Sequence, residues 1–288
     1  MLEIKNITKN YYSLVAVDNV SFDIPQGEVV GILGPNGAGK TTLFKLVAGF
    51  LQPDGGTIRP RSRPWPAIGL KPERLLFPNN MKVAAYLRLV AGVSNSRNVD
   101  QTVRDVLQRV QLTEAANKRI KDCSKGMRQR LGLAQVLIGD PPLLLLDEPT
   151  NGLDPEGQAA IVEMIQQLKA NGKTILLSSH QLHEVTQVCT QLVILNRGRV
   201  HYQSRMADAL TLRPHVTIEV VHPVDDLAPV LTALHPDIDV VGHLVILNDE
   251  AIALRRHVLS LLLGTGHDIV HVVQKRITLE EIYAEAVQ

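Results

Sequence analysis

Residues 34–41 read Gly-Pro-Asn-Gly-Ala-Gly-Lys-Thr, and they directly follow the apolar run Val-Val-Gly-Ile-Leu at residues 29–33. An apolar strand that leads into a glycine-rich turn is typical of a phosphate-binding loop. The glycines tolerate unusual dihedrals and leave room for backbone N–H groups to surround a phosphate. Lys40 would reach the β- and γ-phosphates, and the Thr41 hydroxyl would ligate Mg²⁺. A helix predicted over residues 42–48 points its positive end at the same anion.

The composition predicts a folded protein without a strong charge. The chain has 288 residues, 45% of them hydrophobic, enough for a large domain with a small one. Its 30 Lys and Arg against 29 Asp and Glu give a formal charge of +1, which does not favour a nucleic-acid partner. The two cysteines lie far apart without metal-ligand spacing. No leader pattern opens the chain and no run approaches the roughly 20 apolar residues of a membrane span, so a cytoplasmic location is expected.

A second nucleotide-binding element lies at residues 143–148, where four leucines run into Asp147 and Glu148. A short apolar run predicts a buried parallel strand whose carboxyl end opens on a crevice. Adjacent carboxylates are costly there unless they serve a cation. Asp147 is therefore predicted to hold Mg²⁺, and Glu148 to act as general base on a water molecule.

Three further residues add to this prediction. A buried strand over residues 174–177 leads to His180, which is placed to contact a γ-phosphate, whereas a lone histidine elsewhere is more often structural. Ser124 is the predicted N-cap of a helix that ends near residue 138, and it would aim free N–H groups at an anion. Tyr11, in the turn between two N-terminal strands, offers a ring to stack on adenine; a packing or surface tyrosine is the alternative. Apolar spacing predicts helices over residues 81–91 and 99–110.

Taken in order, these motifs resemble the nucleotide-binding subunit of an ABC transporter. The resemblance covers residues 1 to about 205, with Walker A at 34–41, a signature at 123–128, Walker B at 143–148, the D-loop at 151–154 and the switch histidine at 180. It implies an α/β fold: a P-loop NTPase (RecA-like) core with an antiparallel β subdomain and an α-helical subdomain. It also implies ATP and Mg²⁺ as cofactors, and a head-to-tail dimer in which the signature helix of one subunit covers the ATP of the other.

The resemblance assigns roles residue by residue. The ATP contacts are Tyr11, Gly34, Pro35, Asn36, Gly37, Ala38, Gly39, Lys40, Thr41, Thr42, Ser124, Lys125, Gly126 and Asp154; the Mg²⁺ ligands are Thr41, Glu73 and Asp147; the catalytic residues are Glu148 and His180. Two positions depart from the common pattern. The signature reads Cys-Ser-Lys-Gly-Met rather than Leu-Ser-Gly-Gly-Gln, a form that looks like efflux-type members, and Glu73 stands where many members have the Q-loop glutamine.

Residues 206–288 form a predicted accessory domain. Strand, helix and strand occur twice in its pattern, with helices over residues 224–234 and 252–263, which predicts a small ferredoxin-like α+β unit. Similar tails close the ATPases of bacterial drug-, antibiotic- and copper-related exporters. The histidines of this segment are scattered without ligand spacing, so a metal site is not favoured.

The leading hypothesis is an ATPase subunit of the exporter type that works with an integral-membrane permease on the cytoplasmic face of the inner membrane. Its expected partners are that permease and a second nucleotide-binding subunit, with a homodimer preferred and no nucleic acid. One alternative is a soluble ABC ATPase that acts on nucleic acid or ribosomes. Another is a module in which ATP only switches assembly.

Overall fold

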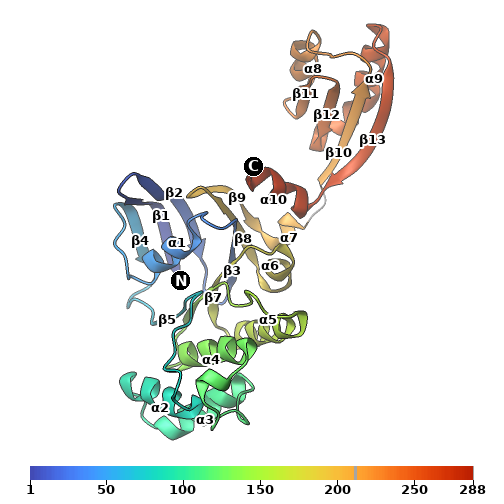
Figure 1. The fold of residues 1–288 in the computed structure, drawn as a ribbon. Coiled ribbons are helices and arrows are strands. Elements are labelled where there is room, and N and C mark those ends of the chain that lie inside the picture. Colours follow the sequence, from blue (N-terminus) through green and yellow to red (C-terminus); the bar gives the residue numbers. More distant parts are fainter. Residues whose placement is uncertain (211–212, 288) are drawn as a thin grey trace. The chain divides into compact units, whose positions relative to one another are not determined.

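The chain folds into two units, seen in a computed structural model that describes residues 1–210 and 213–287 (Figure 1). The side chains of residues 213, 214 and 275–277 are not described, and Thr211, Leu212 and Gln288 of the predicted accessory domain lie outside the described residues. The first unit comprises Met1–Met206 with Ala286–Gln288, and the second Ala207–Glu285.

A six-stranded sheet forms the centre of the first unit, in the order β5-β6-β7-β3-β8-β9. Its strands are β3 (Val29–Leu33), β5 (Ile68–Lys71), β6 (Leu143–Asp147), β7 (Thr174–Ser179), β8 (Gln191–Asn196) and β9 (Arg199–Arg205). The first five are parallel and β9 is antiparallel to β8. Every residue of β3, β6 and β7 is buried, as expected for parallel strands covered on both faces. The predicted buried strands are thereby confirmed.

A second, antiparallel sheet of order β2-β1-β4 packs against the first through a shared core. Its strands are β1 (Leu2–Tyr11), β2 (Leu14–Ile24) and β4 (Gly55–Pro60). The helix α1 (Lys40–Val47) contributes Phe44 to the same cluster as Ile4 and Leu145, so apolar packing fixes this helix between the two sheets. The residues that precede α1 are positioned by this packing.

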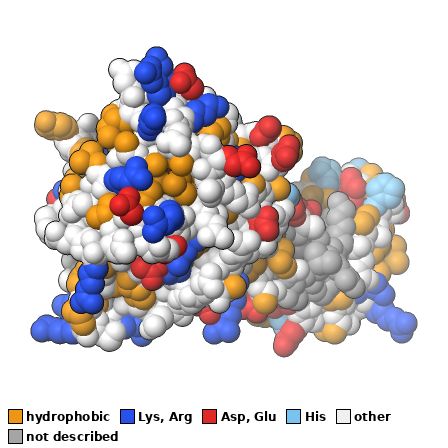
Figure 2. Space-filling model, turned by 90° about the horizontal axis from the view of Figure 1, so that it is seen from below, with side chains coloured by type: hydrophobic (Ala, Val, Ile, Leu, Met, Phe, Trp, Pro, Cys, Tyr) orange, Lys and Arg blue, Asp and Glu red, His pale blue; other side chains and the backbone are white. Residues whose placement is uncertain are grey.

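The remaining helical segments of the first unit are α2 (Val83–Val93), α3 (Val99–Arg109), the short η1 (Ile120–Asp122), α4 (Lys125–Leu137), α5 (Pro155–Ala170) and α6 (Leu182–Val188). The helices predicted over residues 81–91 and 99–110 correspond to α2 and α3, and α7 (Met206–Ala209) begins at Met206 and continues into the second unit. On the face shown in Figure 2, hydrophobic side chains lie among Lys, Arg, Asp and Glu. Among the described helices, none has the length and apolar character that crossing a membrane requires.

The second unit is a four-stranded antiparallel sheet of order β11-β12-β10-β13. Its elements are β10 (Arg213–Val220), α8 (Ala228–Leu234), β11 (Ile238–Val241), β12 (Leu244–Asn248), η2 (Asp249–Leu254), α9 (Arg255–Gly264), β13 (Ile269–Ile277) and α10 (Leu279–Val287). This β-α-β-β-α-β succession is the ferredoxin-like arrangement. The helix predicted over residues 224–234 corresponds to α8, which begins at Ala228 rather than at residue 224, because Pro229 suits the first turn of a helix.

Candidate active site

The phosphate-binding loop connects β3 to α1, and its structure requires glycine for two different reasons. Gly37 and Gly39 have φ values of 83° and 103°, in the left-handed region that favours glycine. Gly34 is needed for space, because a Cβ there would lie 2.1 Å from the Leu195 carbonyl oxygen. The helix begins at Lys40 rather than at the predicted residue 42. Lys40 Nζ donates to the Gly34 carbonyl at 2.5 Å and lies 3.1 Å from Glu148 Oε1.

A Gly39→Ala substitution is expected to distort this loop. The added Cβ would meet the Ala16 carbonyl oxygen at 2.3 Å, in addition to the unfavourable φ. We expect ATP affinity to fall by on the order of tenfold or more, measured by calorimetric titration. Gly172→Ala is the matched control, because Gly172 has a φ of 78° with open space around it. That variant should lose about 1 kcal/mol of stability and keep its ATP affinity; equal losses of affinity in both would contradict the local explanation.

Asp147 lies at the carboxyl end of β6, where hydroxyl groups from two other elements reach it. Thr41 Oγ1 donates to Asp147 Oδ2 at 2.9 Å, and Ser178 Oγ donates to Asp147 Oδ1 at 2.5 Å. Ser178 stands opposite Asp147 in the parallel register of β6 and β7. Burial raises the pKa of Asp147, and the two hydrogen bonds oppose that rise. The structure thus brings together two of the three predicted Mg²⁺ ligands.

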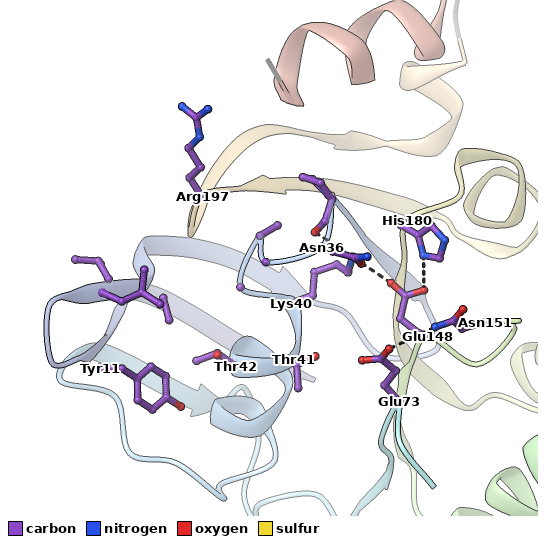
Figure 3. Close-up of a pocket in the computed structure, with 17 residues that line it drawn as sticks. Tyr11, Asn36, Lys40, Thr41, Thr42, Glu73, Glu148, Asn151, His180 and Arg197 are labelled. Carbon is purple, nitrogen blue, oxygen red and sulfur yellow. Dashed lines mark hydrogen bonds and ion pairs between the residues drawn. The ribbon is translucent and has the colours of Figure 1, made fainter.

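Glu148 follows directly and is buried between two cationic or titratable partners (Figure 3). Its Oε1 faces Lys40, and its Oε2 lies 2.8 Å from Nδ1 of His180. Its backbone N–H donates to Ser178 Oγ at 2.9 Å. Its φ is 46°, an uncommon conformation for a residue other than glycine. The predicted base and the predicted switch histidine are therefore in direct contact.

Glu73 and Lys71 bring further charge to this region. The Glu73 carboxylate lines the cavity and accepts a hydrogen bond from Asn151 Nδ2 at 3.3 Å. Lys71, the last residue of β5, is fully buried. Burial lowers the pKa of Lys71 to about 8, against the opposing charges of Asp147, Glu148 and Glu73. The sequence analysis did not single out Lys71.

Most of the phosphate loop, together with Glu73, Glu148 and His180, lines one cavity of about 720 Å³, whereas Asp147 and Lys71 are not among its lining residues. Of the predicted residues it is lined by Tyr11, Pro35, Asn36, Gly37, Ala38, Gly39, Lys40, Thr41, Thr42, Glu73, Glu148 and His180; the residues that the sequence analysis missed are Leu14, Val15, Ala16, Asn151 and Arg197. Figure 3 shows the Tyr11 ring across the cavity from Glu148 and His180, with Arg197 pointing away from both. Arg197 lines the cavity although no local sequence pattern signalled its place beside the phosphate loop.

Four other predicted ATP contacts line a second cavity, of about 440 Å³, and Gly34 lines neither cavity. Ser124 caps α4 by accepting from the Met127 N–H at 3.2 Å, and Asp154 caps α5 by accepting from the Gly157 N–H at 3.1 Å. Lys125 packs over Gly152, since a Cβ on that glycine would lie 1.7 Å from Lys125 Nζ. The two cavities share no lining residue. Ser124, Lys125, Gly126 and Asp154 are therefore on a different surface from the phosphate loop.

A parallel sheet that carries a phosphate loop, with acidic residues at the end of a neighbouring strand, defines a P-loop NTPase. The family model described as ABC transporter matches residues 17–151. The uncharacterized ABC transporter ATP-binding protein YxlF of Bacillus subtilis (strain 168) is 39% identical over 213 residues, covering 72% of each chain. The chain belongs to the ABC transporter ATP-binding family, as its motifs predicted, and it is an ATPase.

Two further comparisons agree with this assignment. The Nod factor export ATP-binding protein I of Cupriavidus metallidurans is 32% identical over 247 residues, covering 82% of this chain and 81% of that protein. A solved ATP-binding cassette, in a dimeric post-hydrolysis state with ADP and Pi, superposes with a TM-score of 0.65 at 23% identity, over 72% of this chain and 99% of the other. Because the sequence identity to this cassette is only 23%, the similarity supports the fold alone.

Proposed function

We propose that the chain is the motor subunit of an ABC exporter, which closes as a head-to-tail dimer on two MgATP and drives a separate transmembrane permease. The observation that carries this proposal is the division of the predicted ATP contacts between two cavities without a shared residue. One subunit supplies the phosphate loop and the other supplies the N-terminus of α4, so a complete ATP site requires two subunits. The export direction is supported by the similarity to a Nod factor export protein.

The residues of the first cavity account for the steps of hydrolysis. Lys40 and the loop amides bind the phosphates, which draws the Lys40 ammonium away from Glu148. The Glu148 carboxylate is then free to accept a proton from the attacking water, and His180 keeps it oriented through the contact at Nδ1. The water oxygen bonds to the γ-phosphorus while the bond from that phosphorus to the β–γ bridging oxygen breaks. Glu148 then gives its proton to the released phosphate or to solvent, which restores the base for the next turnover.

Thr41, which lines this cavity, and the buried Asp147 that it contacts form a donor pair that fits Mg²⁺. The Thr41 hydroxyl and the Asp147 carboxylate, 2.9 Å apart, are hard oxygen donors of the kind that Mg²⁺ prefers together with phosphate oxygens. We propose that these two residues hold the ion and that Glu73 reaches it through water. When bound, Mg²⁺ neutralises charge on the β- and γ-phosphate oxygens.

The proposed permease contact involves exposed apolar side chains of the first unit. Leu76 is 93% exposed and Phe50 is 71% exposed. Burial of these apolar side chains against another chain would be favourable. Leu76 lies three residues after Glu73 in the chain, so a partner that moves Leu76 would also move a residue of the ATP cavity. This contact would keep the subunit on the cytoplasmic face of the inner membrane.

Affinity purification tests the transport role. A tagged chain, expressed in its native host, should co-purify from detergent-solubilised membranes with a polytopic membrane protein in stoichiometric amount, identified by mass spectrometry. Leu76→Asp should reduce that recovery severalfold without unfolding the chain, whereas Leu263→Asp, on a residue 60% exposed in the second unit, should not. Recovery of ribosomes or nucleic acid in place of a membrane protein would overturn the transport role.

A further inference from the structure

Glu184 is a buried carboxylate of α6 that the hydrolysis described above does not use. It is 3% exposed, and its Oε1 has no hydrogen-bond partner among the described residues. Its Oε2 accepts a hydrogen bond of 2.7 Å from Ser179 Oγ. A buried carboxylate with an unpartnered oxygen lowers the free energy of unfolding. Stability alone therefore does not account for a carboxylate here, and its hydrogen bond leads to the residue beside His180.

Ser179 fixes the backbone on both sides of His180. It is the last residue of β7, and its Oγ accepts a hydrogen bond from the Gln181 N–H at 3.0 Å. With its hydroxyl proton donated to Glu184, the Ser179 side chain joins the end of the strand to α6. The Gln181 carbonyl oxygen, 3.4 Å away, is a longer alternative acceptor for that proton. Glu184 therefore decides which way the Ser179 hydroxyl points.

The helix that carries Glu184 is itself packed tightly against the central sheet. A Cβ on Gly31 of β3 would lie 2.7 Å from Cys189 Sγ and 2.7 Å from Val185 Cγ1, so a side chain at Gly31 would clash with α6. This close approach fixes the helix on β3, the strand that leads into the phosphate loop. Glu184 thus ties the end of β7 to a helix whose own place is set by β3.

His180 needs such support because little else holds its side chain. That side chain is 37% exposed, and among the described residues its one hydrogen-bond or ion-pair partner is Glu148, 2.8 Å from Nδ1 (Figure 3). We propose that Glu184 is a positioning residue for ATP hydrolysis: through Ser179 it fixes the backbone around His180, which keeps Nδ1 in contact with Glu148. The inference rests on the proposed roles of Glu148 and His180.

Two substitutions of similar size separate the acceptor oxygen from the rest of the Glu184 side chain. Glu184→Gln keeps an oxygen that can accept from Ser179, so kcat for ATP should stay within about threefold of the wild type. Glu184→Met has no such acceptor, and kcat should fall by on the order of tenfold because His180 is displaced. The dissociation constant for ATP, measured by calorimetry, should stay within about twofold in both, because Glu184 lines neither cavity.

A double-mutant cycle with His180→Ala shows whether Glu184 acts through the histidine. In the His180→Ala background, Glu184→Met should lower kcat by no more than about twofold, since the side chain that it positions is gone. Gln187→Ala is the matched control, because Gln187 is an exposed residue of the same helix and lines neither cavity. That variant should keep the wild-type kcat.

Wild-type kcat in Glu184→Met would overturn the proposal, as would a loss of kcat that persists undiminished in the His180→Ala background. Either result would leave the role of His180 intact. Wild-type kcat in His180→Ala alone would refute the proposed role of His180, and this inference with it. If Glu184→Met does not fold, Ser179→Ala in the Glu184→Gln background takes its place in the cycle with the same expected loss, since it removes the hydroxyl without leaving a buried charge unpaired.

Discussion

Glu148→Gln is expected to lower the steady-state ATPase rate by about 10²-fold or more, the contribution typical of a general base. Glutamine keeps the shape of the side chain but accepts no proton from water. Removal of the carboxylate also releases Lys40, which is 3.1 Å from Glu148 Oε1, so ATP affinity should be kept or raised. With ATP bound and not hydrolysed, the chain should elute as a dimer in size-exclusion chromatography.

Glu163→Gln is the matched control, because Glu163 is an exposed carboxylate on α5 outside both cavities. It should hydrolyse ATP at the wild-type rate and return to the monomer as ATP is consumed. Wild-type turnover in Glu148→Gln would remove this residue from the role of base. Loss of turnover without ATP-dependent dimerisation would leave the base in place and contradict the head-to-tail dimer.

Lys40→Ala is expected to weaken ATP binding by on the order of 100-fold, because a charge-assisted contact with the phosphates is lost. The same change leaves Glu148 buried without its cation, and breaking a buried ion pair costs about 3–5 kcal/mol of stability. Both effects follow from removal of one ammonium group, which lies 3.1 Å from Glu148 Oε1, so ATP titration must be accompanied by urea unfolding.

The double variant Lys40→Ala with Glu148→Gln separates the two effects. It has no unpaired buried carboxylate, so most of the lost stability should return, while ATP binding stays weak. Recovery of ATP binding together with stability would mean that Lys40 acts through folding alone. Unchanged ATP affinity in the Lys40→Ala variant would contradict its assignment to the phosphates.

The parts that were predictable from sequence depend on local pattern. The phosphate loop, the four leucines before Asp147 and the Ser124 cap are each encoded within a few residues, and the structure forms all three. The family and the α/β core followed from their order. The roles assigned to individual site residues remain predictions, although most of those residues do line one of two cavities.

The parts that were not predictable depend on register between distant strands. No local pattern marked Lys71, and its burial results from the pairing of β5 with β6. Likewise, the contact of Glu148 with Lys40 joins the residue after β6 to the first residue of α1, which the sequence separates by about a hundred positions. Arg197 lines the cavity because β8, which it follows, pairs with β3. No local periodicity encodes such proximity.

The left-handed backbone of Glu148 places folding and catalysis in opposition. Holding a residue other than glycine at a φ of 46° lowers the free energy of unfolding by roughly 1–3 kcal/mol relative to a relaxed conformation. Glycine would relieve that cost and asparagine would reduce it, but neither carries a carboxylate. Random selection for thermal tolerance would therefore tend to discard the residue on which turnover depends, and any engineering of a more robust motor has to hold this position fixed.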